Sequence, residues 1–185
     1  MAYTATVDQD KSWEAQAVPL LLEAIQSAFG GTFRQATPDE DLNSGTDAHW
    51  HRQGQSARVA VRARRPEFLK YRHDFTIRED RPQTGNATEL QKIRGGRWAG
   101  LYLYGFCTDT AVLAWSLFRM KHFDENAPFH YMPGFGPGDG KDTVTRLYSA
   151  LSQPPGFLIT CRTSHPFKGL QGTSEKHATK ERTAA

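Results

Sequence analysis

At 185 residues the chain has the length of one domain that can bury a substantial core. A hydrophobic content of 38% and an aromatic content of 11% argue against wholesale disorder, and a mean hydropathy of −0.62 indicates a strongly charged surface. No apolar run approaches the ~20 residues of a membrane span, and the N-terminal residues lack the apolar stretch of a signal peptide. We therefore expect a cytoplasmic protein that does not enter a membrane. The two cysteines, Cys107 and Cys161, are too few for a disulfide framework.

The net charge of +3 is unevenly distributed along the chain. Residues 1–51 carry 2 Lys/Arg and 8 Asp/Glu, residues 52–100 carry 12 and 5, and residues 101–185 carry 9 and 7. The basic excess therefore falls in the middle of the sequence. Because affinity for nucleic acid grows with the number of phosphates that basic side chains neutralise, a phosphate backbone is one partner that this excess favours. The alternative is that these arginines only solvate the faces of strands.

The first half of the chain predicts a helix followed by strands. Residues 12–30 have helical periodicity, with Ser12 as the cap, Gly30 as the end, and Pro19 as a kink or a later start. A short strand over 32–37 and an acidic turn over 38–45 follow. Residues 46–52 and 57–64 then predict a β-hairpin with its turn at Gly54.

The second half predicts a strand over 74–78, a short helix over 86–96, a strand over 99–106 and an amphipathic helix over 111–123. In the helix over 86–96, Asn86 and Glu89 have the spacing of a capping box. Residues 128–141 form a Pro/Gly-rich loop without a phosphate-loop pattern, 142–151 a helix, and 156–162 a last strand. We expect one domain over 1–170 and a mobile polar tail over 171–185.

The predicted hairpin places an acid beside a row of basic side chains. Asp47, His49 and His51 share one side of its first arm, because successive side chains of a strand point to opposite faces. On the second arm, the positions opposite the apolar side are Arg58, Ala60, Arg62 and Arg64. Hydrolysis of a phosphodiester needs carboxylates that hold Mg²⁺ and a cation that stabilises charge on the phosphate. The pattern therefore suggests this chemistry.

With an acid at the start of one central strand and "x-x-R" at the end of the next, the order of elements resembles the PD-(D/E)XK, or restriction-endonuclease-like, nuclease superfamily. The segments "DLNSGTDAHWH", "VAVRARR", "DFTIR", "TELQKI" and "GLYLYGF" are also similar to uncharacterised phage and mobile-element proteins. The resemblance covers about residues 12–120. It implies an α/β (α+β) fold, in which a central mixed β-sheet flanked by helices contains an αβββαβ core.

The resemblance also implies roles for individual residues. Asp47 takes the place of the metal-binding aspartate, Ala60 stands where the second acid belongs, and Arg62 stands where the lysine belongs. Alanine cannot bind a metal, and the high pKa of arginine makes it a phosphate clamp rather than a proton shuttle. The superfamily sometimes supplies the missing acid from the neighbouring helix, where Glu89 could bind the metal beside Lys92.

Glu14 or Glu23 of the first helix is a second source of that acid. The expected cofactor is Mg²⁺, or Mn²⁺. Arg58, Arg64, Arg78, His49 and His51 are the candidate contacts to nucleic acid, and DNA is favoured over RNA.

Each candidate also has a purely structural interpretation. A capping box is the structural interpretation of Glu89, and a cap on the turn after Gly45 is that of Asp47. His49 and His51 have the i, i+2 spacing of metal ligands, but no third ligand with a recognisable spacing accompanies them, which favours a surface or phosphate contact. Arg62 and Arg64 would repel each other on one strand face, so a phosphate or a carboxylate is expected nearby.

Three functions follow from the sequence. The first is a Mg²⁺-dependent nuclease acting on DNA, with Asp47 and Glu89 as metal ligands and Arg62 with Lys92 at the phosphate. The second is a catalytically decayed module that binds nucleic acid, which the alanine at position 60 favours. The third is a phage-encoded inhibitor that binds a host defence nuclease through its segregated charges.

Overall fold

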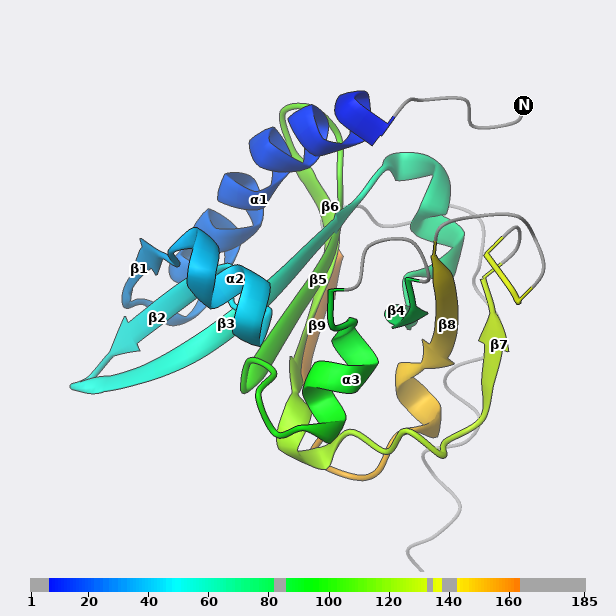
Figure 1. The fold of residues 1–185 in the computed structure, drawn as a ribbon. Coiled ribbons are helices and arrows are strands. Elements are labelled where there is room, and N and C mark those ends of the chain that lie inside the picture. The colour runs from blue at the N-terminus through cyan, green and yellow to red at the C-terminus, as the bar shows by residue number, and fades with distance from the viewer. Residues whose placement is uncertain (1–6, 82–85, 133–134, 138–142, 164–185) are drawn as a thin grey trace, which may run out of the picture.

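The computed structural model describes residues 7–81, 86–132, 135–137 and 143–163, and it contains two β-sheets and three α-helices (Figure 1). The larger sheet has the strand order β1 (Thr32–Gln35), β2 (Ala48–Arg52), β3 (Gln55–Arg64), β5 (Leu101–Cys107), β6 (Val112–Arg119) and β9 (Leu158–Thr163). In this sheet β3 and β5 are parallel, and the other neighbouring strands are antiparallel. The expected combination of a mixed sheet with helices is therefore confirmed at the level of an α+β fold.

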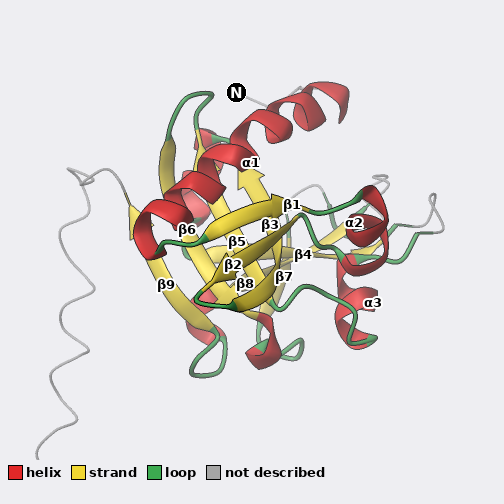
Figure 2. Ribbon diagram, turned by 90° about the vertical axis from the view of Figure 1, so that its left-hand side faces the viewer, coloured by secondary structure: helices red, strands yellow, loops and turns green. Residues whose placement is uncertain are grey.

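The smaller sheet has the antiparallel order β4 (Asp74–Asp80), β8 (Val144–Ser149) and β7 (Phe129–Tyr131). The helices are α1 (Val7–Phe29), α2 (Pro38–Ser44) and α3 (Glu89–Arg94), with short 3₁₀ helices at Pro66–Tyr71, Met120–His122 and Ala150–Ser152. Figure 2 shows α1 across one face of the larger sheet, with α2 and α3 close together at its side.

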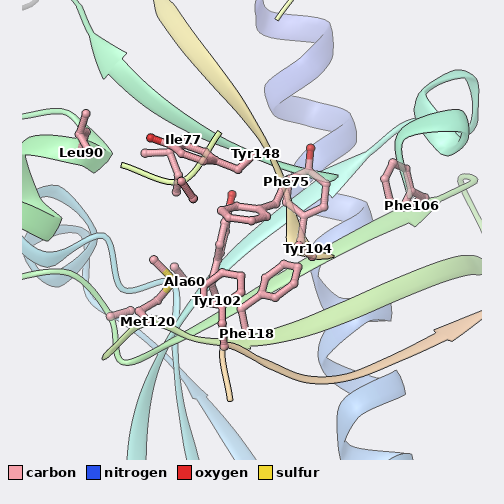
Figure 3. Packing of buried hydrophobic residues seen from close by; sticks show 14 of the residues in the cluster. Ala60, Phe75, Ile77, Leu90, Tyr102, Tyr104, Phe106, Phe118, Met120 and Tyr148 are labelled. Carbon is pink, nitrogen blue, oxygen red and sulfur yellow. The ribbon is translucent and has the colours of Figure 1, made fainter. Parts of the chain in front are cut away.

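The central strands of the larger sheet are buried on both faces, and each face belongs to a different hydrophobic cluster. Along β5, Leu103 and Cys107 pack with α1, where Trp13, Ala17, Leu21 and Ile25 follow one another at helical i, i+4 spacing. The alternate β5 residues Tyr102, Tyr104 and Phe106 pack on the other face with Phe75 and Ile77 of β4 and Tyr148 of β8 (Figure 3). The smaller sheet therefore covers the face that α1 leaves open.

The first half of the chain largely follows the expectations. The hairpin of β2 and β3 forms as predicted, with Gln53 and Gly54 at positive φ in its turn. The opening helix ends at Phe29 before Gly30 (φ 74°), but it begins at Val7, so the assignment of Ser12 as its cap is wrong. Residues 38–45 are not an open turn: Thr37 caps helix α2, which ends at Gly45 in the left-handed conformation.

Two predicted helices are strands. Residues 111–123 form β6 and a 3₁₀ turn, because Ala114 and Phe118 pack on one face of the sheet while Trp115 and Leu117 pack on the other. A strand buried on both faces has no alternating pattern and looks like a buried helix in sequence. Residues 142–151 contain β8, which pairs with β4 and β7.

The remaining expectations concern three strands, which form, and a loop, which begins with a strand. The predicted last strand forms as β9, and the predicted strands over 74–78 and 99–106 form as β4 and β5. The predicted loop over 128–141 opens with strand β7; residues 133–134 and 138–141 lie outside the described residues, as does the tail over 171–185.

Candidate functional site

A cavity of about 760 Å³ lies among α1, the start of β2, β3 and the α2 and α3 helices. Five of the residues singled out in the sequence line it, namely Asp47, Arg62, Arg78, Glu89 and Lys92. They come from the start of β2, from β3, from β4 and from α3, so the fold brings together side chains that are up to 45 positions apart (92 − 47). This volume is typical of a small-molecule or cofactor site.

Asp47 is held at the hairpin by two backbone contacts. Its N–H donates to the carbonyl of Val59 at 2.9 Å, and its carboxylate Oδ2 accepts from the N–H of Val61 at 2.6 Å. Burial raises the pKa of this carboxyl from 3.8 to about 7, with Asp41 and Glu14 adding to the increase and the Val61 N–H and Arg62 opposing it. Burial therefore disfavours the charged form of Asp47, and a cation bound beside the carboxylate would offset that effect.

Glu89 is bound by two arginines. Its Oε1 accepts a short hydrogen bond from Arg62 and one of 2.9 Å from Arg78 Nε, while Oε2 accepts from the backbone N–H of Arg78 at 2.8 Å. The side chain retains only 7% of its exposure. The capping box of α3 is made by Thr88 and Gln91, so the expected box of Asn86 and Glu89 is wrong. Glu89 is the first residue of the helix, and its carboxylate points into the arginine pair.

Arg62 lies between several carboxylates. Besides Glu89, its Nη1 lies 3.7 Å from Oε1 of Glu14 on α1. Burial acts to lower the pKa of the guanidinium, but Glu89 and Glu14 outweigh it and hold the pKa well above its ordinary value. The expected carboxylate beside Arg62 is thus present. Ala60, on the same strand, is 1% exposed and belongs to the hydrophobic core (Figure 3).

Lys92 reaches the cavity from the next turn of α3. Its Nζ donates to the backbone carbonyl of Asp41 at 3.1 Å, which ties α3 to α2, and it lies 6.0 Å from the ring centre of Trp98. Burial lowers the pKa of its ammonium, and the charges of Asp41 and Glu89 oppose that effect. Lys92 therefore combines a structural contact with a positive charge at the cavity.

The other predicted contacts to nucleic acid lie away from this cavity. Arg58 donates to the carbonyls of Arg97 and Trp98, and Arg64 donates to the hydroxyls of Tyr104 and Thr76. His49 Nε2 lies 2.8 Å from Glu40, with His51 stacked beside it at 6.4 Å between ring centres. The arginine row of β3 thus contributes one member, Arg62, to the cavity.

Several lining residues were not singled out in the sequence, among them Asp41, Arg81 and Trp98. Of the two alternative acids on the first helix, Glu14 lines the cavity, whereas Glu23 is an exposed residue and is not part of the lining. The two glutamates are nine positions apart, which places them on opposite sides of the helix, and Glu14 lies beside the buried stripe of α1. Helical spacing is therefore the signal that favours Glu14 over Glu23.

The carboxylates do not form a ready-made metal cage. Within the described ranges, no three or more side chains of His, Cys, Asp and Glu are grouped so that they could hold a metal ion. Mg²⁺ is commonly held by only one or two carboxylates together with phosphate oxygens and water. By the chemistry of its donors, the pair of Asp47 and Glu14 fits that arrangement. Glu89 would first have to release Arg62 or Arg78.

Among the helices in the described part of the chain, none has the length and apolar character needed to span a lipid bilayer. No family model, no curated protein and no solved structure matches this chain.

Proposed function

We propose that this chain is a PD-(D/E)XK-type domain that cleaves phosphodiester bonds of nucleic acid, preferably DNA, with Mg²⁺. The observation that carries the proposal is that Asp47, Arg62, Glu89 and Lys92, inferred from three separate segments of the sequence, line one cavity. The order of elements is in keeping with it: α1, β1, β2 and β3 are followed, after β4, by α3 and β5, and β5 pairs with β3 in parallel. When α2, which lies between β1 and β2, and β4 of the smaller sheet are set aside, this order corresponds to the αβββαβ arrangement that the resemblance implies, and it supports the proposal.

In this proposal Asp47 and Glu14 hold the metal, and the prediction that Glu89 also binds it requires release of an arginine. Bound Mg²⁺ supplies Lewis-acid activation of the phosphate and a more acidic water. Arg62 and Lys92 neutralise charge on the phosphate. Glu89 orients Arg62 and Arg78, since both guanidinium groups donate to it. Deprotonation of Asp47, whose pKa is about 7, prepares the cavity for a cation.

The decisive experiment compares three variants in a cleavage assay on plasmid and single-stranded DNA with Mg²⁺ or Mn²⁺. Asp47→Asn and Glu14→Gln should each lower the rate by about 100-fold or more, because a lost ligand removes several kcal/mol of stabilisation and 1.4 kcal/mol is tenfold. Glu23→Gln changes an exposed carboxylate of the same helix outside the cavity and should retain the activity. Undiminished cleavage by Asp47→Asn would eliminate the proposed mechanism.

A second candidate is a non-cleaving module that binds nucleic acid. Two observations favour it: the buried alanine at position 60 and the engagement of both Glu89 oxygens by Arg62 and Arg78. In that case the chain retards DNA with a steep salt dependence and does not cut it under any metal condition. Arg81→Ala, at the cavity, should then weaken binding, whereas Arg94→Ala, whose side chain pairs with Glu125, should not.

A further inference from the structure

The cavity has two chemically different walls. Its charged wall consists of the acids and bases described above, and its apolar wall consists of Val18 and Leu22 of α1, Phe33 of β1, Leu42 of α2 and Trp98. A site for phosphate alone would need only the charged wall. A cavity lined by both charged and apolar side chains suits a ligand that has both an anionic part and a flat or apolar part.

Leu42 is the most accessible part of the apolar wall. It retains 52% of its exposure, and α2 has no buried residue of its own. The helix is nevertheless held in place, because Lys92 binds the Asp41 carbonyl and the Trp98 ring packs directly against Gly45, the residue that ends α2. A ligand that covers this apolar side chain removes it from water, and this burial favours binding.

Two donors at the cavity have no acceptor. Arg62 Nε and Trp98 Nε1 are both buried, and neither has a hydrogen-bond partner in the described part of the chain. Both atoms have almost no accessible surface, so neither faces the open cavity. A buried donor without a partner costs about 1–3 kcal/mol, and a ligand that brings oxygen or nitrogen acceptors would recover this only when the side chain of Arg62 or Trp98 turns toward it.

We propose that the cavity takes up a single unpaired nucleotide, so that the substrate is single-stranded nucleic acid rather than an intact duplex. The phosphate lies at Arg62 and Lys92, and the base lies against Leu42, Phe33 and Trp98. Bases inside a duplex are stacked and paired, so they cannot reach a wall inside a cavity of about 760 Å³. The inference rests on the proposed function, since it names the substrate class of the same site.

The test measures binding without cleavage, by fluorescence anisotropy in EDTA. The probes are a labelled single-stranded deoxyoligonucleotide, the same sequence closed into a duplex, and an equally long strand with abasic sites throughout. The intact single strand should bind on the order of 10-fold more tightly than either of the others, because base contacts add to equal phosphate charge. A single-stranded RNA of the same sequence shows which sugar is preferred.

Leu42→Ser should bring the affinity for the single strand close to that for the abasic strand. Leu151→Ser, at a position that is 76% exposed and outside the cavity lining, is the matched control and should change nothing. Equal affinity for intact and abasic strands, a preference for duplex, or no binding of single-stranded DNA and RNA would overturn the inference. Cleavage of a duplex without any dependence on the bases would overturn the inference but would agree with the proposed nuclease activity. Base-dependent binding without cleavage would support the inference and contradict the nuclease activity.

Discussion

At the scale of single residues, burial raises the pKa of Asp47 to about 7, which places its titration in a pH range where stability can be measured. Its raised pKa means that, between about pH 4 and pH 7, the folded chain binds more protons at this position than the unfolded chain does. This contribution to stability is therefore present at low pH and is lost as the pH rises through about 7. A cation at the cavity would reverse the effect, because it favours the charged carboxylate.

Asp47→Asn should consequently stabilise the protein most at high pH. The asparagine can still accept from the Val61 N–H but does not titrate, so the variant should gain up to about 4 kcal/mol over the parent between pH 4 and pH 8. Thermal unfolding at several pH values, in the absence of divalent ions, measures this. Asp39→Asn, which removes an exposed carboxylate of α2, should give a profile parallel to the parent's. If the pH profile of stability for the Asp47 variant is also parallel to that of the parent, the pKa of Asp47 is not raised in the folded chain.

At the scale of elements, α2 and α3 have the same kind of cap but different packing. Thr37 and Thr88 each form a capping box, with Glu40 and Gln91 respectively. α3 buries Leu90 completely and carries Glu89 and Lys92, whereas no residue of α2 is buried. Fraying of α2 therefore leaves the core intact, although it displaces Asp41 and Leu42 at the cavity, whereas fraying of α3 disturbs the core and the cavity together.

Thr88→Ala should lower the free energy of unfolding by about 1 kcal/mol, the usual contribution of a cap, and Thr37→Ala should lower it much less. Denaturant unfolding of the two variants measures the difference directly. Equal losses would mean that α2 is as firmly coupled to the core as α3 is.

The elements also show why part of the fold could be predicted from the sequence. The hairpin of β2 and β3 has alternating residues and a Gly54 turn, so local chemistry specifies it. β6 has Trp115 and Leu117 on one face and Ala114 and Phe118 on the other, and both faces are covered. Its sequence therefore contains no periodic signal, and neighbouring segments decide that it is a strand.

At the scale of the whole molecule, the larger sheet is coupled to the candidate site through the packing of α1. Gly105 of β5 faces α1, where an added Cβ would lie 2.2 Å from Cδ2 of Leu21, itself completely buried. α1 also carries Glu14 to the cavity. A displacement of α1 from the sheet would thus change the position of Glu14 relative to the Arg62 guanidinium.

Gly105→Ala should destabilise the protein by about 1–3 kcal/mol, because the Leu21 side chain has no room to move. Gly100→Ala is the control, since nothing lies within 4 Å of a Cβ at that position. Thermal unfolding of the two variants separates the effect of close packing from that of removing a glycine. Similar unfolding midpoints for the two variants would show that α1 shifts easily to make room for the added methyl group.

The sequence by itself determined the local elements that have their own signal: the opening helix, the hairpin, strand β5 and helix α3. It also singled out Asp47, Arg62, Glu89 and Lys92 as candidates, through the resemblance of their segments to a family's motifs, and these residues line one cavity. Only the tertiary structure decided that Glu89 is bound by Arg62 and Arg78, that α1 carries Glu14 to the cavity, and that Arg58 and Arg64 do not reach it. These contacts depend on the angles at which helices and sheets pack, and those angles are set by side-chain shape across distant parts of the chain.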